Sequence, residues 1–137
     1  MEVVEINKEH ISFCMDNLIN EQSKKGLRKI GEATGYTQKN LVKISKILSS
    51  IFMVATKEEK EYMQKRDALI IKDEIGRPIL TEKGEFKFSD DIAANKNHVA
   101  FLTKPLQIPY KKIELYDVMP AEVSPHDLIS LSFLIQD

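Results

Sequence analysis

The clearest pattern along the chain is an apolar position at every seventh residue between residues 41 and 69. The repeat consists of Leu41, Leu48, Ala55, Tyr62 and Leu69. Ile44 and Ile51 fill the second apolar position of the first two repeats, which is the spacing of one helical stripe. Thr37 stands just before the pattern and belongs to a residue type that caps helices. The sequence therefore predicts one long helix over residues 38–70, about 50 Å in length.

A shorter helical pattern precedes the long helix. Asn7 is a candidate N-cap, and the apolar residues that follow at helical spacing are Ile11, Cys14, Met15, Leu18 and Ile19. We expect a helix over residues 8–23 that ends at Lys25-Gly26. A rod as long as the second helix cannot bury its whole length in a small core without a partner helix, so we expect the two helices to form a hairpin over residues 8–70.

Residues 71–137 show shorter patterns with frequent turn residues. The segments 78–81 and 85–88, joined by a turn at 82–84, predict a β-hairpin. Ser89 can cap a helix over residues 90–103. The residues expected on the inner side of that helix are Ile92, Val99 and one of Phe101 and Leu102.

The C-terminal part predicts one strand and one short helix. Alternating apolar residues indicate an extended strand over residues 107–118 that is interrupted near Pro109, which suits an edge position. Ser124 and Asp127 fit a capping box for a helix over residues 125–135. The apolar side chains of this helix, available to dock on a partner, are Leu128, Leu131, Phe133, Leu134 and Ile135. The predicted fold is α+β in a single domain, 1–137: a long helical hairpin, a small antiparallel β-sheet and a short C-terminal helix.

The composition fits a soluble domain without disulfides. The chain has 137 residues, of which 42% are hydrophobic and 30% charged, and one domain of this size buries an adequate core. The longest nearly uncharged run, residues 47–56, is far shorter than the roughly 20 residues that span a bilayer. The first five residues lack the features of a signal peptide, so we expect a cytoplasmic protein. Cys14 is the only cysteine, which excludes an intramolecular disulfide and a metal site built on a cysteine pair.

A net charge of −1 hides a strong asymmetry. Between residues 24 and 46, one acid, Glu32, faces seven basic residues: Lys24, Lys25, Arg28, Lys29, Lys39, Lys43 and Lys46. From residue 113 onward no Lys or Arg occurs, and the acids are Glu114, Asp117, Glu122, Asp127 and Asp137. Such a chain can bind an anionic partner, or it can pair its own halves.

Residues 27–46 have two interpretations. As a DNA-reading helix-turn-helix, they place Ile30, Gly31, Gly35, Tyr36, Leu41 and Ile44 at the buried and turn positions. The residues facing DNA are then Thr37, Gln38, Lys39, Asn40 and Lys43. Alternatively the glycines make the bend of a helical hairpin, and the lysines form a solvated face. In either case the candidate partner-binding residues are Arg28, Lys29, Lys39, Asn40, Lys43 and Lys46.

The residues predict no catalytic, cofactor or metal site. His10, His98 and His126 belong to three separate predicted elements and have no helical pairing. Gly76 and Gly84 flank the predicted hairpin and lack the Lys-Ser/Thr of a phosphate-binding loop. We therefore expect a protein that is not an enzyme. An enzymatic site would require His98 and His126 to converge in one cleft.

Several motifs resemble a group of small uncharacterised proteins of phages and prophages of Gram-positive bacteria. They are Lys-Asn-Leu-x-Lys-Ile (39–44), Tyr-x-x-Lys-Arg-Asp-x-Leu-Ile (62–70), Lys-Asp-x-x-Gly-x-Pro-Ile (72–79), Gly-Glu-Phe-Lys-Phe (84–88) and Ser-Pro-x-Asp-Leu-x-x-Leu-x-Phe-Leu-Ile (124–135). The resemblance spans nearly the whole chain and implies an accessory phage role, with no catalytic residue to transfer.

The expected function is therefore protein–protein binding. The partner would be a component of virion assembly or a host factor such as a defence system, met in the bacterial cytoplasm or in the virion. A homo-oligomer is compatible with this reading. The alternative is a helix-turn-helix transcriptional regulator that uses residues 27–46.

Overall fold

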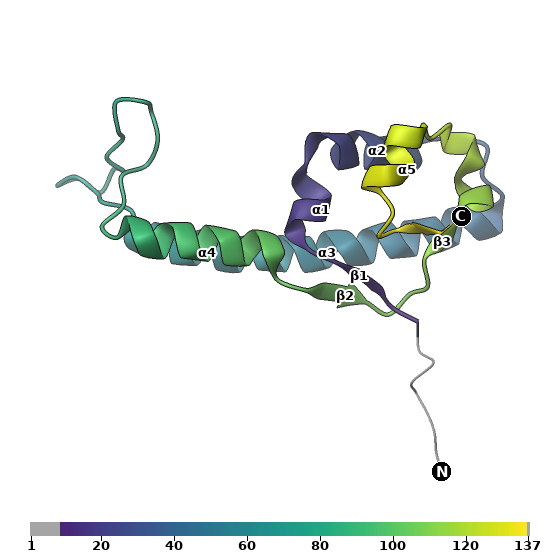
Figure 1. Ribbon diagram of the computed structural model, residues 1–137, viewed down its shortest axis with the longest axis horizontal. Coiled ribbons are helices and arrows are strands. Elements are labelled where there is room, and N and C mark those ends of the chain that lie inside the picture. Colours follow the sequence, from purple (N-terminus) through teal and green to yellow (C-terminus); the bar gives the residue numbers. More distant parts are fainter. Residues whose placement is uncertain (1–8, 137) are drawn as a thin grey trace, which may run out of the picture.

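The computed structural model describes residues 9–136. The helices are α1 (Met15–Ile19), α2 (Glu21–Glu32), α3 (Gln38–Leu69), α4 (Asp91–Thr103), the 3-10 helix η2 (Leu115–Ala121) and α5 (Pro125–Ser130). The strands are β1 (Ile11–Phe13), β2 (Leu106–Ile108), β3 (Ile113–Glu114) and β4 (Ile135–Gln136). Figure 1 shows α3 running the length of the molecule, with α1, α2 and α5 gathered along one half and α4 along the other.

The predicted long helix is confirmed, because α3 continues unbroken over 32 residues. It begins after Thr37, whose hydroxyl accepts a hydrogen bond from the backbone N–H of Asn40 at 3.2 Å. In the preceding turn, Gly35 has a φ of 97°, a conformation that favours glycine. The hydroxyl of Tyr36 donates to the carbonyl of Ile30 at 2.8 Å and so ties this turn to α2.

The prediction of a helix over residues 8–23 is wrong. Ile11 and Phe13 are buried while Ser12 between them is exposed, and this alternation forms β1. β1 pairs with β2 in an antiparallel sheet, so a partner remote in sequence decides the conformation. The predicted N-cap, Asn7, lies outside the described residues.

The rest of that segment forms two helices, not one. Asn20 has an extended backbone that ends α1, and its side chain caps α2 by accepting from the N–H of Ser23 at 2.8 Å. α2 then passes the predicted stop and continues to Glu32. A Cβ atom on Gly26 would lie 2.8 Å from Cδ1 of Leu131. The glycine therefore permits a close approach between α2 and the C-terminal segment.

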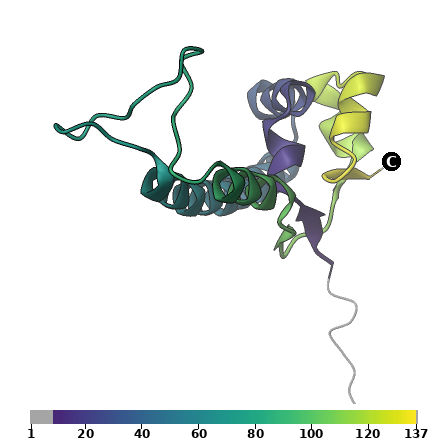
Figure 2. The ribbon, with the colours of Figure 1, turned by 60° about the vertical axis from the view of Figure 1, so that its left-hand side comes forward.

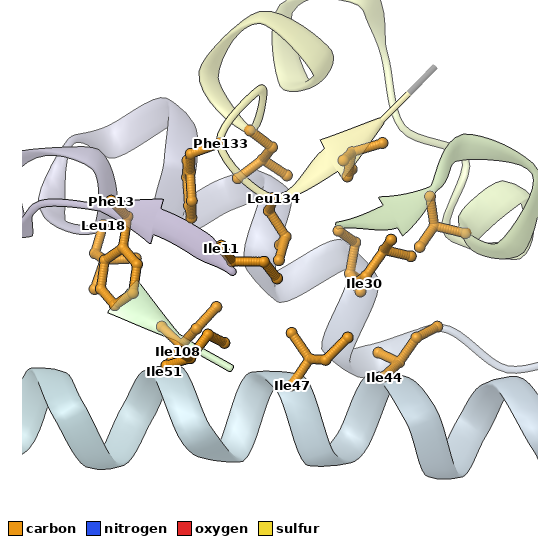
Figure 3. Close-up of a cluster of buried hydrophobic side chains, with 14 of the residues drawn as sticks. Ile11, Phe13, Leu18, Ile30, Ile44, Ile47, Ile51, Ile108, Phe133 and Leu134 are labelled. Carbon is orange, nitrogen blue, oxygen red and sulfur yellow. The ribbon is translucent and has the colours of Figure 1, made fainter. Parts of the chain in front are cut away.

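The first half of α3 forms one wall of the core. Ile44, Ile47 and Ile51 are 3%, 1% and 5% exposed and point from α3 into the apolar cluster of Figure 3. The other members of the cluster are Ile11, Phe13, Met15, Leu18, Ile30, Leu106, Ile108, Ile113, Val118, Ala121, Leu131, Phe133, Leu134 and Ile135. Because these residues come from both ends of the chain, the core joins the N-terminal, central and C-terminal segments.

The second half of α3 packs against α4, which returns antiparallel to it (Figure 1). Tyr62 stacks on Phe101 with ring centroids 4.5 Å apart. Near the end of α4, Nζ of Lys104 donates to Oε1 of Glu58 at 2.9 Å. The long helix thus has a helical partner, but the partner is α4 and not the predicted N-terminal helix.

The start and the buried side of α4 also differ from the prediction. The N-cap is Asp90, whose side chain accepts a backbone hydrogen bond in the first turn. Ser89 instead donates from its hydroxyl to the carbonyl of Leu69. Ile92 and Val99 were expected on the inner side but are 84% and 48% exposed. Apolar residues occur all round this helix, so their spacing alone does not select the buried side.

The predicted β-hairpin forms as a series of single bridges. Leu80 pairs with Phe86, and the N–H of Thr81 donates to the carbonyl of Glu85 at 2.7 Å around the turn at Gly84. Residues 71–89 together form an arm that stands out from the end of α3 and α4 (Figure 2).

The C-terminal segment follows the prediction at its cap and departs from it elsewhere. The capping box is confirmed, because the N–H of Asp127 donates to the hydroxyl of Ser124 and the N–H of Ser124 donates to the carboxylate of Asp127. The strand predicted over residues 107–118 is interrupted near Pro109 as expected, since β2 ends at Ile108, but it resumes only as β3 and gives way to η2 at Leu115. The helix predicted to end at residue 135 ends at Ser130.

The apolar residues of this C-terminal element face the interior. Leu131, Phe133, Leu134 and Ile135 are all buried. The expectation that they dock on a partner is therefore wrong, since they pack in the chain's own core.

The α+β fold class is confirmed. Long and short helices surround two two-stranded sheets in the described part of the chain. β1 and β2 are antiparallel, as predicted for the sheet, whereas β3 and β4 are parallel.

Two substitutions in α3, one on its buried side and one on its exposed side, should differ in their effect on stability. We expect Ile47→Ala to lower the free energy of unfolding by about 2–5 kcal/mol, because it leaves a cavity in the core. Phe52→Ala should change that free energy by no more than about 0.5 kcal/mol, because Phe52 is 69% exposed. Urea denaturation followed by circular dichroism measures both. Equal losses would show that Phe52 also supports the fold.

Candidate functional site

The six predicted partner-binding residues lie on α2 and on the first turns of α3. Arg28, Lys39 and Lys46 are exposed, as expected for residues that contact a partner. The other three, Lys29, Asn40 and Lys43, are bonded to acids of the C-terminal segment.

Lys29 bonds to the buried carboxylate of Asp127. Its Nζ donates to Oδ2 at 2.6 Å, and Nε2 of Gln22 donates to Oδ1 at 2.8 Å. Burial alone would raise the pKa of Asp127, but the hydrogen bonds from Lys29, Ser124 and Gln22 outweigh burial and hold this pKa well below its usual value. Asp127 is fully buried, so Lys29 supports the packing of α5 on α2 and is not a free cation.

Asp117 of η2 bonds in a similar way to two residues in the first turns of α3. Nζ of Lys43 donates to its Oδ2 at 3.1 Å, and Nδ2 of Asn40 donates to Oδ1 at 3.4 Å. Together with the pair of Lys29 and Asp127, this contact decides between the two readings of the charge asymmetry at these positions. Two of the seven basic residues of the segment, Lys29 and Lys43, pair with acids of the C-terminal half of the same chain.

The geometry bears on the helix-turn-helix interpretation as well. The sharp turn at Gly35 and the cap at Thr37 are present. However, Asn40 and Lys43, two of the residues that would face DNA, surround the carboxylate of Asp117. A carboxylate at that position repels phosphate and occupies the donors that base recognition would need.

A row of apolar side chains stands exposed along α3, on the side away from the core. Its members, which we call the α3 stripe, are Leu41, Val42, Phe52, Met53 and Met63. Leu41, Phe52 and Met63 follow one another at intervals of eleven residues, which is about three helical turns, so they share one side of the helix. Phe52 and Met53 leave 69% and 70% of their area exposed. Ser45, Ser49 and Thr56 separate the apolar side chains.

Four exposed lysines run beside the α3 stripe. We call Lys39, Lys46, Lys57 and Lys60 the lysine row. None of them has an ion-pair partner among residues 9–136. Lys39 and Lys46 were predicted as site residues, whereas the α3 stripe was not. The signal that could have found it is the uncharged run over residues 47–56, which is apolar on more than one side of the helix.

A cleft of about 690 Å³ lies between the second half of α3, α4 and the arm of residues 71–89. The hydroxyl of Tyr62 lies 3.2 Å from Nδ1 of His98, and the guanidinium of Arg66 lies 5.1 Å from the ring centroid of Phe86. The cleft offers aromatic surfaces and hydrogen-bonding groups. His126, in contrast, is on α5, which packs against α2 in the other half of the molecule (Figure 1), so the two histidines required for the enzymatic hypothesis do not converge.

Two further observations limit the kinds of site in the described residues. Within residues 9–136, no group of three or more His, Cys, Asp and Glu side chains is arranged to hold a metal ion. In the same part of the chain, no helix has both the length and the apolar character needed to cross a bilayer. Comparisons with protein-family models, curated proteins and solved structures find no match to the chain.

The buried ion pair predicts a large effect for a conservative change. Asp127→Asn should lower the free energy of unfolding by about 2–3 kcal/mol, because it removes the charge that Lys29 and two other donors stabilise. Asp117→Asn is the matched control, and its loss should be at most about 1 kcal/mol, because both partners of that pair are partly exposed. Urea denaturation of the two variants measures the difference. A loss for Asp127→Asn no larger than that of the control would contradict the structural role given to Lys29.

The same carboxylate predicts a dependence of stability on pH. Because the pKa of Asp127 is lower in the folded than in the unfolded chain, its contribution is present above 3.8, the ordinary carboxyl value, and is lost as pH falls toward the folded pKa. The stability difference between the wild type and Asp127→Asn should therefore shrink from about pH 6 to about pH 3. Urea titrations at both pH values test this, and a difference that stays constant would count against the charge-based explanation.

Proposed function

We propose that the protein is a non-enzymatic accessory protein of a phage or prophage that acts by binding another protein along the α3 stripe. The observation that carries this proposal is the exposure of Phe52 and Met53 near the middle of a helix whose opposite side is embedded in the core. Large apolar side chains gathered on one exposed side of a small domain commonly mark a surface that another protein covers.

The α3 stripe offers apolar area to a partner. Full burial of a large apolar side chain contributes about 1.5–3 kcal/mol, and these five still expose 42–70% of their area, so covering them recovers roughly half of that amount from each toward the entropy lost on association. A helix fixed to a core on one side is already ordered, which lowers that entropic cost further. The arrangement suits recognition in which helices pack with apolar contacts every few turns.

The biological setting rests on the sequence resemblance. A phage or prophage protein of this kind would meet its partner in the bacterial cytoplasm or in the virion, either as a component of virion assembly or as an inhibitor of a host factor such as a defence system. These roles share one requirement, a stable protein surface that a partner recognises, and the α3 stripe supplies a candidate for it.

DNA binding is the second candidate, favoured by the turn at Gly35 and by the exposed Lys39 and Lys46. Protein binding accounts for more of the surface. Duplex DNA presents mainly phosphates and base edges, and these give no role to Phe52, Met53 or Met63 on the same helix. The position of Asp117 among the proposed base-reading residues also favours a protein partner.

Photo-crosslinking tests the proposal at a single residue. With p-benzoylphenylalanine in place of Phe52, irradiation of phage-infected cells should produce an adduct that protease destroys and nuclease does not. The control carries the same group in place of Ile92, an exposed residue of α4 outside the α3 stripe. An adduct sensitive to nuclease, or equal adducts at both positions, would argue against protein binding through this side of α3.

A further inference from the structure

The lysine row lies along one side of the α3 stripe. Lys39, Lys46 and Lys57 are separated by seven and eleven residues, so they lie within about 20° of one another around the helix. Lys60 lies closer to the apolar side chains. Met53 stands beside this row, so a molecule that covers Met53 also approaches the lysines.

Two of the acids in the same half of α3, Glu58 and Glu61, lie toward α4, and Glu59 is exposed on the side of Leu41 and Phe52, away from the lysine row. Glu58 accepts hydrogen bonds from Lys104 at the end of α4. Glu61 lines the groove between the two helices, and the hydrogen bond to Glu58, helped by the charge of Glu61, raises the pKa of the same lysine. Lys57 and Lys60 are exposed and have no ion-pair partner in the described part of the chain. The edge of the α3 stripe that carries the lysine row is therefore the positively charged one.

Other basic residues of α2 and α3 form ion pairs that stabilise the fold. Lys29 and Lys43 each meet a carboxylate of the C-terminal segment. Lys39, Lys46, Lys57 and Lys60 form no ion pair among residues 9–136 and lie beside exposed apolar side chains. Charge complementarity across an interface then requires acids in the molecule that covers the α3 stripe.

We propose that the α3 stripe receives an amphipathic helix of a protein partner that carries Asp and Glu along one edge of its apolar side. Apolar residues of that helix would fill the positions over Ser45, Ser49 and Thr56, between the larger side chains of α3. Its acids would face the lysine row. This inference rests on the proposed function, since it names the chemistry of the partner bound at the same surface.

A second copy of this chain fits less well. In an antiparallel pair the same edges of the two helices meet, which places one lysine row against the other. In a parallel pair the row meets the edge that carries Leu41 and Phe52, where Glu59 is an isolated acid. Both arrangements leave most of the lysines without a partner, so self-association lacks the charge complementarity that an acidic helix provides.

An anionic membrane surface also fits less well. A helix that lies in a membrane interface buries a continuous apolar side. On α3 the polar residues Ser45, Ser49 and Thr56 interrupt the apolar side chains. Interdigitation with a second helix tolerates such small residues, because they form the holes that receive side chains.

A pair of synthetic peptides tests the proposal on the full chain. Each is a labelled helix-forming peptide of about 20 residues, long enough to span the α3 stripe from Val42 to Met63, with leucines on one side. One carries glutamates along the edge of that side, and the other carries lysines at the same positions. Fluorescence anisotropy should show at least about tenfold tighter binding of the acidic peptide, with the preference reduced at high salt.

Two double variants assign the binding to this surface. The double variant Lys46→Glu with Lys57→Glu should lower the affinity for the acidic peptide at least about tenfold. The control, Lys83→Glu with Lys96→Glu, changes exposed positions of the arm and of α4 and should alter that affinity less than about twofold. Phe52→Ser with Met53→Ser should also abolish most of the binding. Thermal melts followed by circular dichroism confirm that each variant is folded.

The outcomes separate the inference from the proposed function. Equal binding of both peptides, no binding of either, or no effect of the lysine reversals would overturn the acidic helix. If Phe52 still crosslinks to a protein in that case, protein binding through the α3 stripe stands and its partner has a different chemistry. Binding of duplex DNA or anionic vesicles that survives Phe52→Ser with Met53→Ser would overturn the inference in favour of an electrostatic site.

Discussion

A helix of 32 residues is about 48 Å long, which exceeds the width of the core that this chain builds. The architecture follows from that constraint. Ile44, Ile47 and Ile51 anchor the first half of α3 in the core, and α4 covers the second half through Tyr62 and its stacked partner Phe101. Neither cover reaches the side of α3 on which the exposed apolar residues lie. The length that gives the molecule its shape also leaves this surface available.

The basic residues of α2 and α3 also divide into two groups, one paired within the fold and one exposed. Asp117 accepts hydrogen bonds from Asn40 and Lys43, which holds η2 against α3. Asp127 accepts one from Lys29, which holds α5 against α2. A buried carboxylate is costly unless its donors are in place, so the pair of Lys29 and Asp127 fixes how α5 sits on α2. The lysine row beside the α3 stripe is not used in this way. Basic residues that looked equivalent in the sequence thus have two different environments.

The sequence predicted the parts of the fold that local rules determine. The heptad pattern and Thr37 gave α3, and Ser124 with Asp127 gave the capping box of α5. It failed where distant segments decide the structure. β1 has only three residues and owes its strand conformation to β2, and Lys29 meets an acid 98 positions away. No pattern within residues 24–46 distinguishes a lysine that will be paired from one that will stay exposed.

The α3 stripe was missed for a related reason, and the reason bears on function. Periodicity identifies one apolar side of a helix, and on α3 that side is the isoleucine side that enters the core. Phe52 and Met53 fall outside the pattern, and the core is complete without them. Polar residues at these positions would cost the fold little and would improve solubility. Two large apolar side chains that folding does not require, next to lysines that form no ion pair among residues 9–136, are best explained by a partner that contacts both.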